Sequence, residues 1–277
     1  MEPGTTGIDE REINVLLNDL LEVYGYDFTN YSKASVKRRI DNLYSKDKFP
    51  SFAEFRYRLR NDENYLLRFV EQVTVNVTEM FRDPSFYKTL RTEVLPMLAA
   101  RPVIRIWHAG CSTGEEVFSM AILLKEANLL HKSLLYATDI NPGVLEKLRK
   151  GIFPLSQMKQ YSENYNLTGS RDDLSKYFTA QYDWAKFDES LSRQMIISTH
   201  NLVSDSSFNE FHLIVCRNVL IYFDKTLQDK VLQLFDQSLE TLGFLALGSK
   251  EALRFSSIYK KYKQLENREK MWRKMEP

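Results

Sequence analysis

The feature that most constrains the fold is an alternation of short apolar runs with helical stretches, which begins after Pro102. The apolar runs, predicted as strands, span residues 103–107, 134–138, 195–198, 211–216 and 243–248, and the predicted helices span residues 115–127, 142–150 and 226–242. Strands joined by helices of this length form parallel βαβ units. The sequence therefore predicts an α/β domain with a doubly wound, mostly parallel sheet, in which a ligand would lie at the carboxyl ends of the strands.

The first 73 residues follow a helical period instead. Apolar residues recur every three or four positions from Ile13 to Tyr24 and stop at Gly25, and three further amphipathic segments follow. We therefore expect a small all-α domain at 1–73, a linker at 74–101 that contributes to the active site, and the α/β domain at 102–277. Residues 151–194 are polar and rich in Tyr, Ser and Asp, and they predict an irregular insertion or cap.

Composition excludes several classes of protein. The 38 Lys and Arg against 37 Asp and Glu leave a net charge of +1, so no global field favours nucleic acid or an anionic membrane. The apolar runs are too short to cross a bilayer, and the acidic first residues do not resemble a signal peptide. The chain has two Cys and four His without ligand spacing, which predicts a cytoplasmic protein with no disulfide framework and no metal.

The first strand runs into a glycine-containing turn, Gly110-Cys111-Ser112-Thr113-Gly114-Glu115-Glu116, and then directly into a helix. Glycines at this place let a ligand approach the backbone closely. The turn has neither the phosphate-loop nor the dinucleotide-loop pattern, and it places two carboxylates where a pyrophosphate would lie. This arrangement suits a cationic ligand such as S-adenosylmethionine. Alternatively, Glu115 and Glu116 only complement the helix dipole.

Polar residues follow three further predicted strands where they leave the sheet. Asp139 ends the second strand, where a carboxylate can bind both ribose hydroxyls, although it could also be only the cap of the next helix. Asn201 and Leu202 follow the third strand and could border an adenine, or could form only a turn. Arg217 and Asn218 follow the fourth, apolar strand, where polar groups need partners.

Two more sets of polar residues complete the candidate site. Asn76, Thr78 and Arg82 lie in the junction, spaced along one side of a turn that enters a helix, for which an N-cap with an exposed Arg is the ordinary alternative. Tyr222 follows Asn218 after four residues. The position of both sets near strand ends or the domain junction makes them candidates for contact with a bound ligand.

In this order and at these separations, the motifs resemble the CheR family, whose members use S-adenosylmethionine to methylate glutamate side chains of bacterial chemoreceptors. The pattern N-x-T-x-F-F-R-D matches residues 76–83, with Met80 in place of the first Phe. The pattern G-x-S-T-G-E-E matches residues 110–116, and C-R-N-V-x-I-Y-F matches residues 216–223. The resemblance covers nearly the whole chain.

The resemblance implies a set of site residues and a partner. S-adenosylmethionine, and its product S-adenosylhomocysteine, would be bound by Asn76, Thr78, Arg82, Gly110, Glu116, Asp139, Asn201, Leu202, Arg217 and Asn218. Arg82 and Tyr222 would be catalytic, as the groups nearest the transferred methyl. The partner would be the cytoplasmic helical domain of a chemoreceptor, docked on the basic cluster Lys37, Arg38 and Arg39. A solvated helix face explains this cluster about as well.

The sequence departs from the family pattern at two places. Family members commonly read G-H-S-E after the fifth strand, whereas this chain has Gly248-Ser249-Lys250-Glu251. Residues 171–194 contain no Gly, whereas family members that bind the C-terminal peptide of a receptor have a glycine-rich turn there. We therefore expect recognition without a C-terminal tether peptide.

Two other functions remain open at this stage. One is a methyltransferase of the same fold that acts on nucleic acid or a small molecule. Nucleic-acid enzymes that methylate amino groups carry [DN]-P-P-[YF] after the fourth strand, whereas this chain has Arg217-Asn218-Val219-Leu220. The other is a regulatory module that binds the cofactor without turnover.

Overall fold

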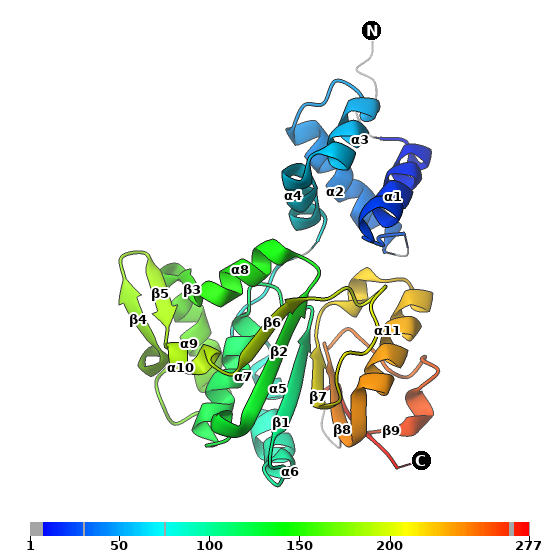
Figure 1. Ribbon diagram of the computed structural model, residues 1–277. Coiled ribbons are helices and arrows are strands. Elements are labelled where there is room, and N and C mark those ends of the chain that lie inside the picture. The colour runs from blue at the N-terminus through cyan, green and yellow to red at the C-terminus, as the bar shows by residue number, and fades with distance from the viewer. Residues whose placement is uncertain (1–7, 30, 75, 266–268, 277) are drawn as a thin grey trace.

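Side-chain caps mark the start of three of the four helices at the N-terminal end of the chain. The structure is a computed structural model that describes residues 8–29, 31–74, 76–265 and 269–276. The helices are α1 (Glu10–Tyr24), α2 (Lys33–Lys46), α3 (Phe52–Asn61) and α4 (Glu63–Val73). Asp9 and Glu12 form a capping box at the start of α1, and Gly25 ends that helix in the left-handed region at φ 74°. These helices form the predicted all-α domain, which stands above the α/β domain (Figure 1).

The α/β domain is built on a seven-stranded sheet with the order β6-β2-β1-β7-β8-β10-β9. Its strands are β1 (Ile104–Ala109), β2 (Ser133–Asp139), β6 (Met195–Thr199), β7 (Phe211–Cys216), β8 (Leu239–Leu247), β9 (Tyr262–Gln264) and β10 (Met271–Lys274). The first five strands are parallel, as predicted, and β10 and β9 add an antiparallel edge. Strand order reverses between β1 and β7, which is where such sheets bind ligands.

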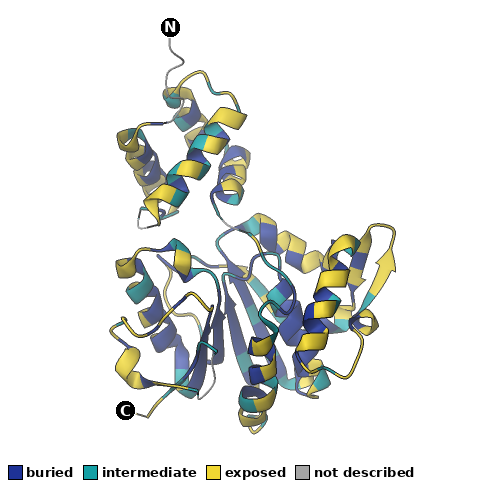
Figure 2. Cartoon of the chain, turned by 180° about the vertical axis from the view of Figure 1, so that it is seen from behind, coloured by how far each residue is buried: buried dark blue, intermediate teal, exposed yellow. Residues whose placement is uncertain are grey.

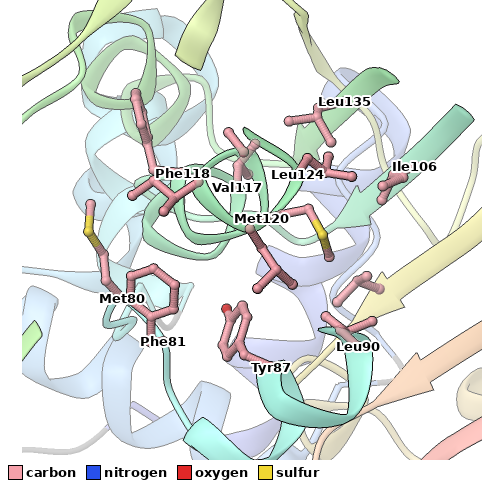
Figure 3. Close-up of a cluster of buried hydrophobic side chains, with 14 of the residues drawn as sticks. Met80, Phe81, Tyr87, Leu90, Ile106, Val117, Phe118, Met120, Leu124 and Leu135 are labelled. Carbon is pink, nitrogen blue, oxygen red and sulfur yellow. The ribbon is translucent and has the colours of Figure 1, made fainter. Parts of the chain in front are cut away.

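Helices cover both faces of the sheet. They are α5 (Pro84–Thr89), the π-helical η1 (Leu90–Val94), α6 (Leu95–Leu98), α7 (Glu115–Glu126), α8 (Pro142–Lys150), α9 (Met158–Leu167), α10 (Glu189–Ser192) and α11 (Lys225–Ser238), with the short turns η2 (Leu130–Lys132), η3 (Leu155–Gln157), η4 (Leu174–Tyr177), η5 (Leu220–Tyr222) and η6 (Tyr259–Lys261). Figure 2 shows the strands of the sheet as buried between these helices. Successive residues of a strand point to opposite faces. Ile106 therefore packs with Met120 of α7 (Figure 3), whereas Trp107 packs with Phe235 of α11.

Two sequence predictions about organisation need correction, and one about the junction is matched. The junction enters a helix at Pro84, as its sequence indicated, and Tyr87 and Leu90 of the following residues pack into the core of the α/β domain (Figure 3). The predicted irregular insertion holds a three-stranded antiparallel sheet of β3 (Ile152–Pro154), β5 (Trp184–Phe187) and β4 (Phe178–Gln181). The helix predicted to reach residue 242 ends at Ser238, because Leu239 already pairs with Phe211. The small sheet was missed because its strands have only three or four residues each. The early start of β8 was missed because it depends on pairing with β7, which is a tertiary contact.

Within the described residues, no helix is long and apolar enough to cross a membrane.

Candidate active site

One cavity opens at the carboxyl edge of the sheet. All ten residues that the sequence suggested for cofactor binding line it, namely Asn76, Thr78, Arg82, Gly110, Glu116, Asp139, Asn201, Leu202, Arg217 and Asn218. Tyr222 lines it as well. The cavity is thus formed by the segments that follow β1, β2, β6 and β7, together with the junction between the two domains. The fold brings together motifs that lie far apart in the sequence.

The turn after β1 requires glycine for two physical reasons. Gly110 has φ +75° and Gly114 has φ +96°, a region that side chains rarely adopt. A Cβ atom at Gly110 would lie 2.6 Å from Cγ2 of Val219, and one at Gly114 would lie 2.5 Å from Cγ of Leu148. The turn can therefore approach the loop after β7 and helix α8 closely, which forms one wall of the cavity.

The structure distinguishes the two glutamates of this turn. The Glu116 carboxylate lies 2.9 Å from Nδ1 of His108 and 3.6 Å from Nη1 of Arg217. Burial alone would raise the pKa of Glu116, but the hydrogen bond with His108 and the Arg217 charge hold it below the ordinary value. Glu115 does not line the cavity, and burial raises its pKa to about 7. Glu116 is thus the ionised carboxylate that faces a ligand.

Asp139 is 8% exposed and does not cap the following helix. The N-cap of α8 is Asn141, whose side chain accepts a hydrogen bond from the backbone N–H of Gly143 at 2.9 Å. The Asp139 carboxylate accepts one bond from the N–H of Ser112 at 2.9 Å and one from the N–H of Asn141 at 3.0 Å. Each oxygen keeps a second lone pair for a ligand in the cavity. The alternative that Asp139 is only a helix cap is therefore excluded.

Asn201 and Leu202 form a turn that also contacts the helical domain. Oδ1 of Asn201 accepts a bond from the N–H of Val203 at 3.0 Å, and its Nδ2 donates to the carbonyl oxygen of Gly25 at 3.3 Å. Leu202 is 8% exposed and lines the cavity. These contacts hold the turn in place and leave the Leu202 side chain as an apolar wall.

The two arginines of the cavity have different environments. Arg217 donates to Oδ2 of Asp83 at 2.5 Å and to the carbonyl oxygen of Arg82 at 3.2 Å, and its guanidinium lies 4.1 Å from the ring centre of Phe86. The Arg82 guanidinium has neither a hydrogen bond nor an ion pair with any described residue, and it lines the cavity. Arg217 thus fastens the junction to the sheet, whereas Arg82 keeps its donors for another molecule.

Tyr222 lies near two cations. Burial raises the pKa of the Tyr222 phenol, while the charges of Arg39 and Arg82 oppose that rise. Tyr222 is therefore a neutral hydrogen-bond donor at physiological pH.

Glu251 holds the loop that carries Asn218 and Tyr222. Its carboxylate accepts bonds from the backbone N–H groups of Gly248 at 2.5 Å, Asn218 at 3.1 Å, Val219 at 2.9 Å and Leu220 at 2.8 Å. Asn218 is left-handed, with φ 62°. This chain's Gly248-Ser249-Lys250-Glu251 differs from the family pattern G-H-S-E at Ser249 and Lys250, which are both exposed. The glutamate that the two patterns share, Glu251, is the residue that holds the loop.

The basic cluster of α2 does not form one exposed surface. Lys37 pairs with Asp41 at 3.1 Å and donates to the carbonyl oxygen of Ile8. Arg39 reaches the end of α4, where Nη1 lies 3.3 Å from the carbonyl oxygen of Thr74. Arg38 is exposed. The three side chains point in different directions because successive positions on a helix are about 100° apart.

Sequence reasoning missed other residues that line the cavity, among them Tyr31, Ile140 and His200. Tyr31 comes from the helical domain, and no motif marked it. Across the described part of the chain, no group of three or more His, Cys, Asp or Glu is placed to hold a metal ion.

Comparisons with known proteins agree with this geometry. The SAM binding domain of CheR methyltransferase matches residues 76–271, and the all-alpha domain of the same family matches residues 11–74. The Pseudomonas putida protein Cher3 is 44% identical over 95% of this chain and 96% of its own length. A chemotaxis protein methyltransferase of Listeria monocytogenes is 32% identical, covering 83% of this chain and 85% of its own. The chain therefore belongs to the CheR methyltransferase family, and its cofactor is S-adenosylmethionine.

Proposed function

We propose that this protein is a protein-glutamate O-methyltransferase that acts in the cytoplasm on the helical signalling domain of chemoreceptors. Relatives with the name chemotaxis protein methyltransferase, from Listeria monocytogenes and Salmonella typhimurium, support a role in chemotaxis. The observation that carries the proposal is that the Arg82 guanidinium, which has no partner among the described residues, shares the cavity with neutral Tyr222 and with the carboxylates of buried Asp139 and half-buried Glu116.

The residues of the cavity fit the cofactor. When bound, S-adenosylmethionine supplies a methyl group activated by a sulfonium cation. We assign Asp139 to the ribose hydroxyls, Asn201 and Leu202 to the border of the adenine, and Glu116 to the cationic ammonium. The hydroxyl oxygen of Ser112, which is buried and without a hydrogen-bond partner among the described residues, supports a further polar contact in the cavity. Ligands with charges opposite to these carboxylates are favoured in such a buried site.

The proposed reaction needs no general base. A glutamate carboxylate is ionised at neutral pH and can attack the methyl directly. Transfer forms a bond between a carboxylate oxygen and the methyl carbon, and the sulfonium S–C bond breaks with its electron pair left on sulfur. Arg82 would orient the incoming carboxylate through two parallel hydrogen bonds, and Tyr222 would donate one more. The site thus contributes positioning and exclusion of water, worth several kcal/mol of barrier.

The proposal predicts a base-labile methyl ester on receptor glutamates. We expect transfer of a radiolabelled methyl group from S-adenosylmethionine to a receptor cytoplasmic fragment, with the label released as methanol by mild base. A fragment with its methyl-accepting glutamates changed to alanine is the control. A base-stable product would instead indicate methylation of another group. Cofactor binding without any transfer would indicate a regulatory module.

Substrate docking is assigned to the helical domain. Arg38 is exposed on α2 and carries the charge that an acidic receptor helix would meet. Lys37 and Arg39 are engaged within the protein, so we propose that they set the shape of this surface more than they bind the partner directly.

Recognition is expected not to depend on a receptor's C-terminal tail. The hairpin between β4 and β5 turns at Tyr182 and Asp183, and Tyr182 adopts φ 52° without the help of glycine. We predict that a receptor fragment without its C-terminal residues is methylated as fast as the intact fragment, measured as kcat/KM. A large loss on truncation, with cofactor affinity unchanged, would show that this hairpin region does bind a tail.

A further inference from the structure

The helical domain touches the loop that carries Tyr222. The backbone N–H of Ser32 donates to the carbonyl oxygen of Tyr222 at 2.8 Å, and Tyr31 forms an antiparallel bridge with Phe223. The rings of Tyr31 and Phe223 pack edge to face, with centres 4.8 Å apart. Tyr31 also packs on Phe28 of its own domain, at 5.1 Å. The Tyr31 ring is therefore fixed from both domains.

The Tyr31 side chain lines the same cavity as Asp139. Its hydroxyl forms no hydrogen bond with any described residue. Burial, followed by the charge of Asp139, raises the pKa of the Tyr31 phenol, so the hydroxyl is protonated at physiological pH. The hydroxyl is thus available to a molecule in the cavity, at the side where Asp139 lies.

The helical domain also touches the other loops of the cavity. Nδ2 of Asn201 donates to the carbonyl oxygen of Gly25 at 3.3 Å, and Ile140, which follows β2 and lines the cavity, packs against the apolar core of the helical domain. The segments after β2, β6 and β7 are therefore each in contact with residues of the first 74. The helical domain forms part of the wall of the cavity and is not only attached through the junction.

We propose that Tyr31 is a further cofactor-binding residue, supplied by the helical domain, which hydrogen-bonds the ribose of S-adenosylmethionine beside Asp139. This inference rests on the proposed assignment of the cavity to the cofactor. It follows that the bound cofactor contacts both domains. Cofactor binding should therefore hold the helical domain, and with it the proposed docking surface, against the loop that carries Tyr222.

The test is the affinity for S-adenosylhomocysteine, measured by calorimetry on the full chain. Tyr31→Phe keeps the ring contacts with Phe28 and Phe223 and removes only the hydroxyl. We expect its Kd to rise roughly 3- to 10-fold, as for the loss of one hydrogen bond. The control is Tyr57→Phe, since Tyr57 is 69% exposed on α3 and does not line the cavity. Its Kd should equal that of the wild type.

A second measurement tests the contact between the domains. In the wild type, S-adenosylhomocysteine should slow amide hydrogen exchange around Ser32, and Tyr31→Ala should abolish that slowing. If Tyr31→Phe bound S-adenosylhomocysteine with an unchanged Kd while Asp139→Ala bound it more weakly, the role of Tyr31 would be overturned. The assignment of the cavity to the cofactor would stand. A wild-type protein that binds no S-adenosylhomocysteine would overturn both the cavity assignment and this inference.

Discussion

Replacing Arg82 with lysine should lower kcat/KM for receptor methylation by roughly 10²-fold, in line with the loss of one positioning group at an active site. The variant should fold normally, because the guanidinium of Arg82 has no hydrogen bond or ion pair with the described residues and its contact with Arg217 goes through the backbone carbonyl oxygen. Lysine keeps the charge but cannot form two parallel hydrogen bonds with a carboxylate. A loss of kcat/KM in this variant would therefore show that the geometry of the Arg82 guanidinium matters, because the positive charge is unchanged.

Steady-state kinetics at saturating cofactor would measure this effect. Arg193→Lys is the matched control, because Arg193 is exposed and lies outside the cavity. Tyr222→Phe should lower kcat/KM less than Arg82→Lys does, since it removes one hydroxyl and leaves the ring packed. Near wild-type turnover by Arg82→Lys would show that Arg82 supplies only charge or packing. The orienting role would then move to Tyr222, because Arg217 is engaged with Asp83 and Phe86.

Replacing Asp139 with alanine should weaken the binding of S-adenosylmethionine and S-adenosylhomocysteine by roughly 1.5–3 kcal/mol, the range for the loss of charged hydrogen bonds. The structure adds a second consequence. The N–H groups of Ser112 and Asn141 would lose their acceptor, so some loss of thermal stability without cofactor should accompany the loss of affinity. Asp139→Asn keeps one acceptor oxygen and should lie between the wild type and alanine in both measurements.

Calorimetric titration with S-adenosylhomocysteine measures the affinity, and thermal unfolding without ligand measures the stability. Asp183→Ala serves as the control, because Asp183 is exposed at the turn between β4 and β5 and does not line the cavity. If Asp139→Ala bound the product as tightly as the wild type, Asp139 would have no part in the ribose site, and its function would be limited to holding the turn after β1.

Much of the architecture could be predicted from local patterns. The helical period of apolar residues marked the four N-terminal helices, and short apolar runs marked the five parallel strands, because each pattern is set by a residue's own neighbours in the chain. The edge strands β9 and β10 and the small sheet of β3, β5 and β4 escaped notice. Their strands have only three or four residues each, too few for a period to appear. The start of β8 was missed because it depends on pairing with β7.

The motifs by themselves marked eleven of the residues that line the cavity, because the topology of a parallel sheet brings the carboxyl ends of its strands to one edge. Only the tertiary structure decided what each residue does there. It separated ionised Glu116 from Glu115, whose burial raises its pKa, and it separated Arg82, without a partner among the described residues, from the paired Arg217. It also placed Tyr31 against the cavity. Charge state and hydrogen-bond partners depend on burial and on neighbours distant in the chain, and these form only when the domains pack together.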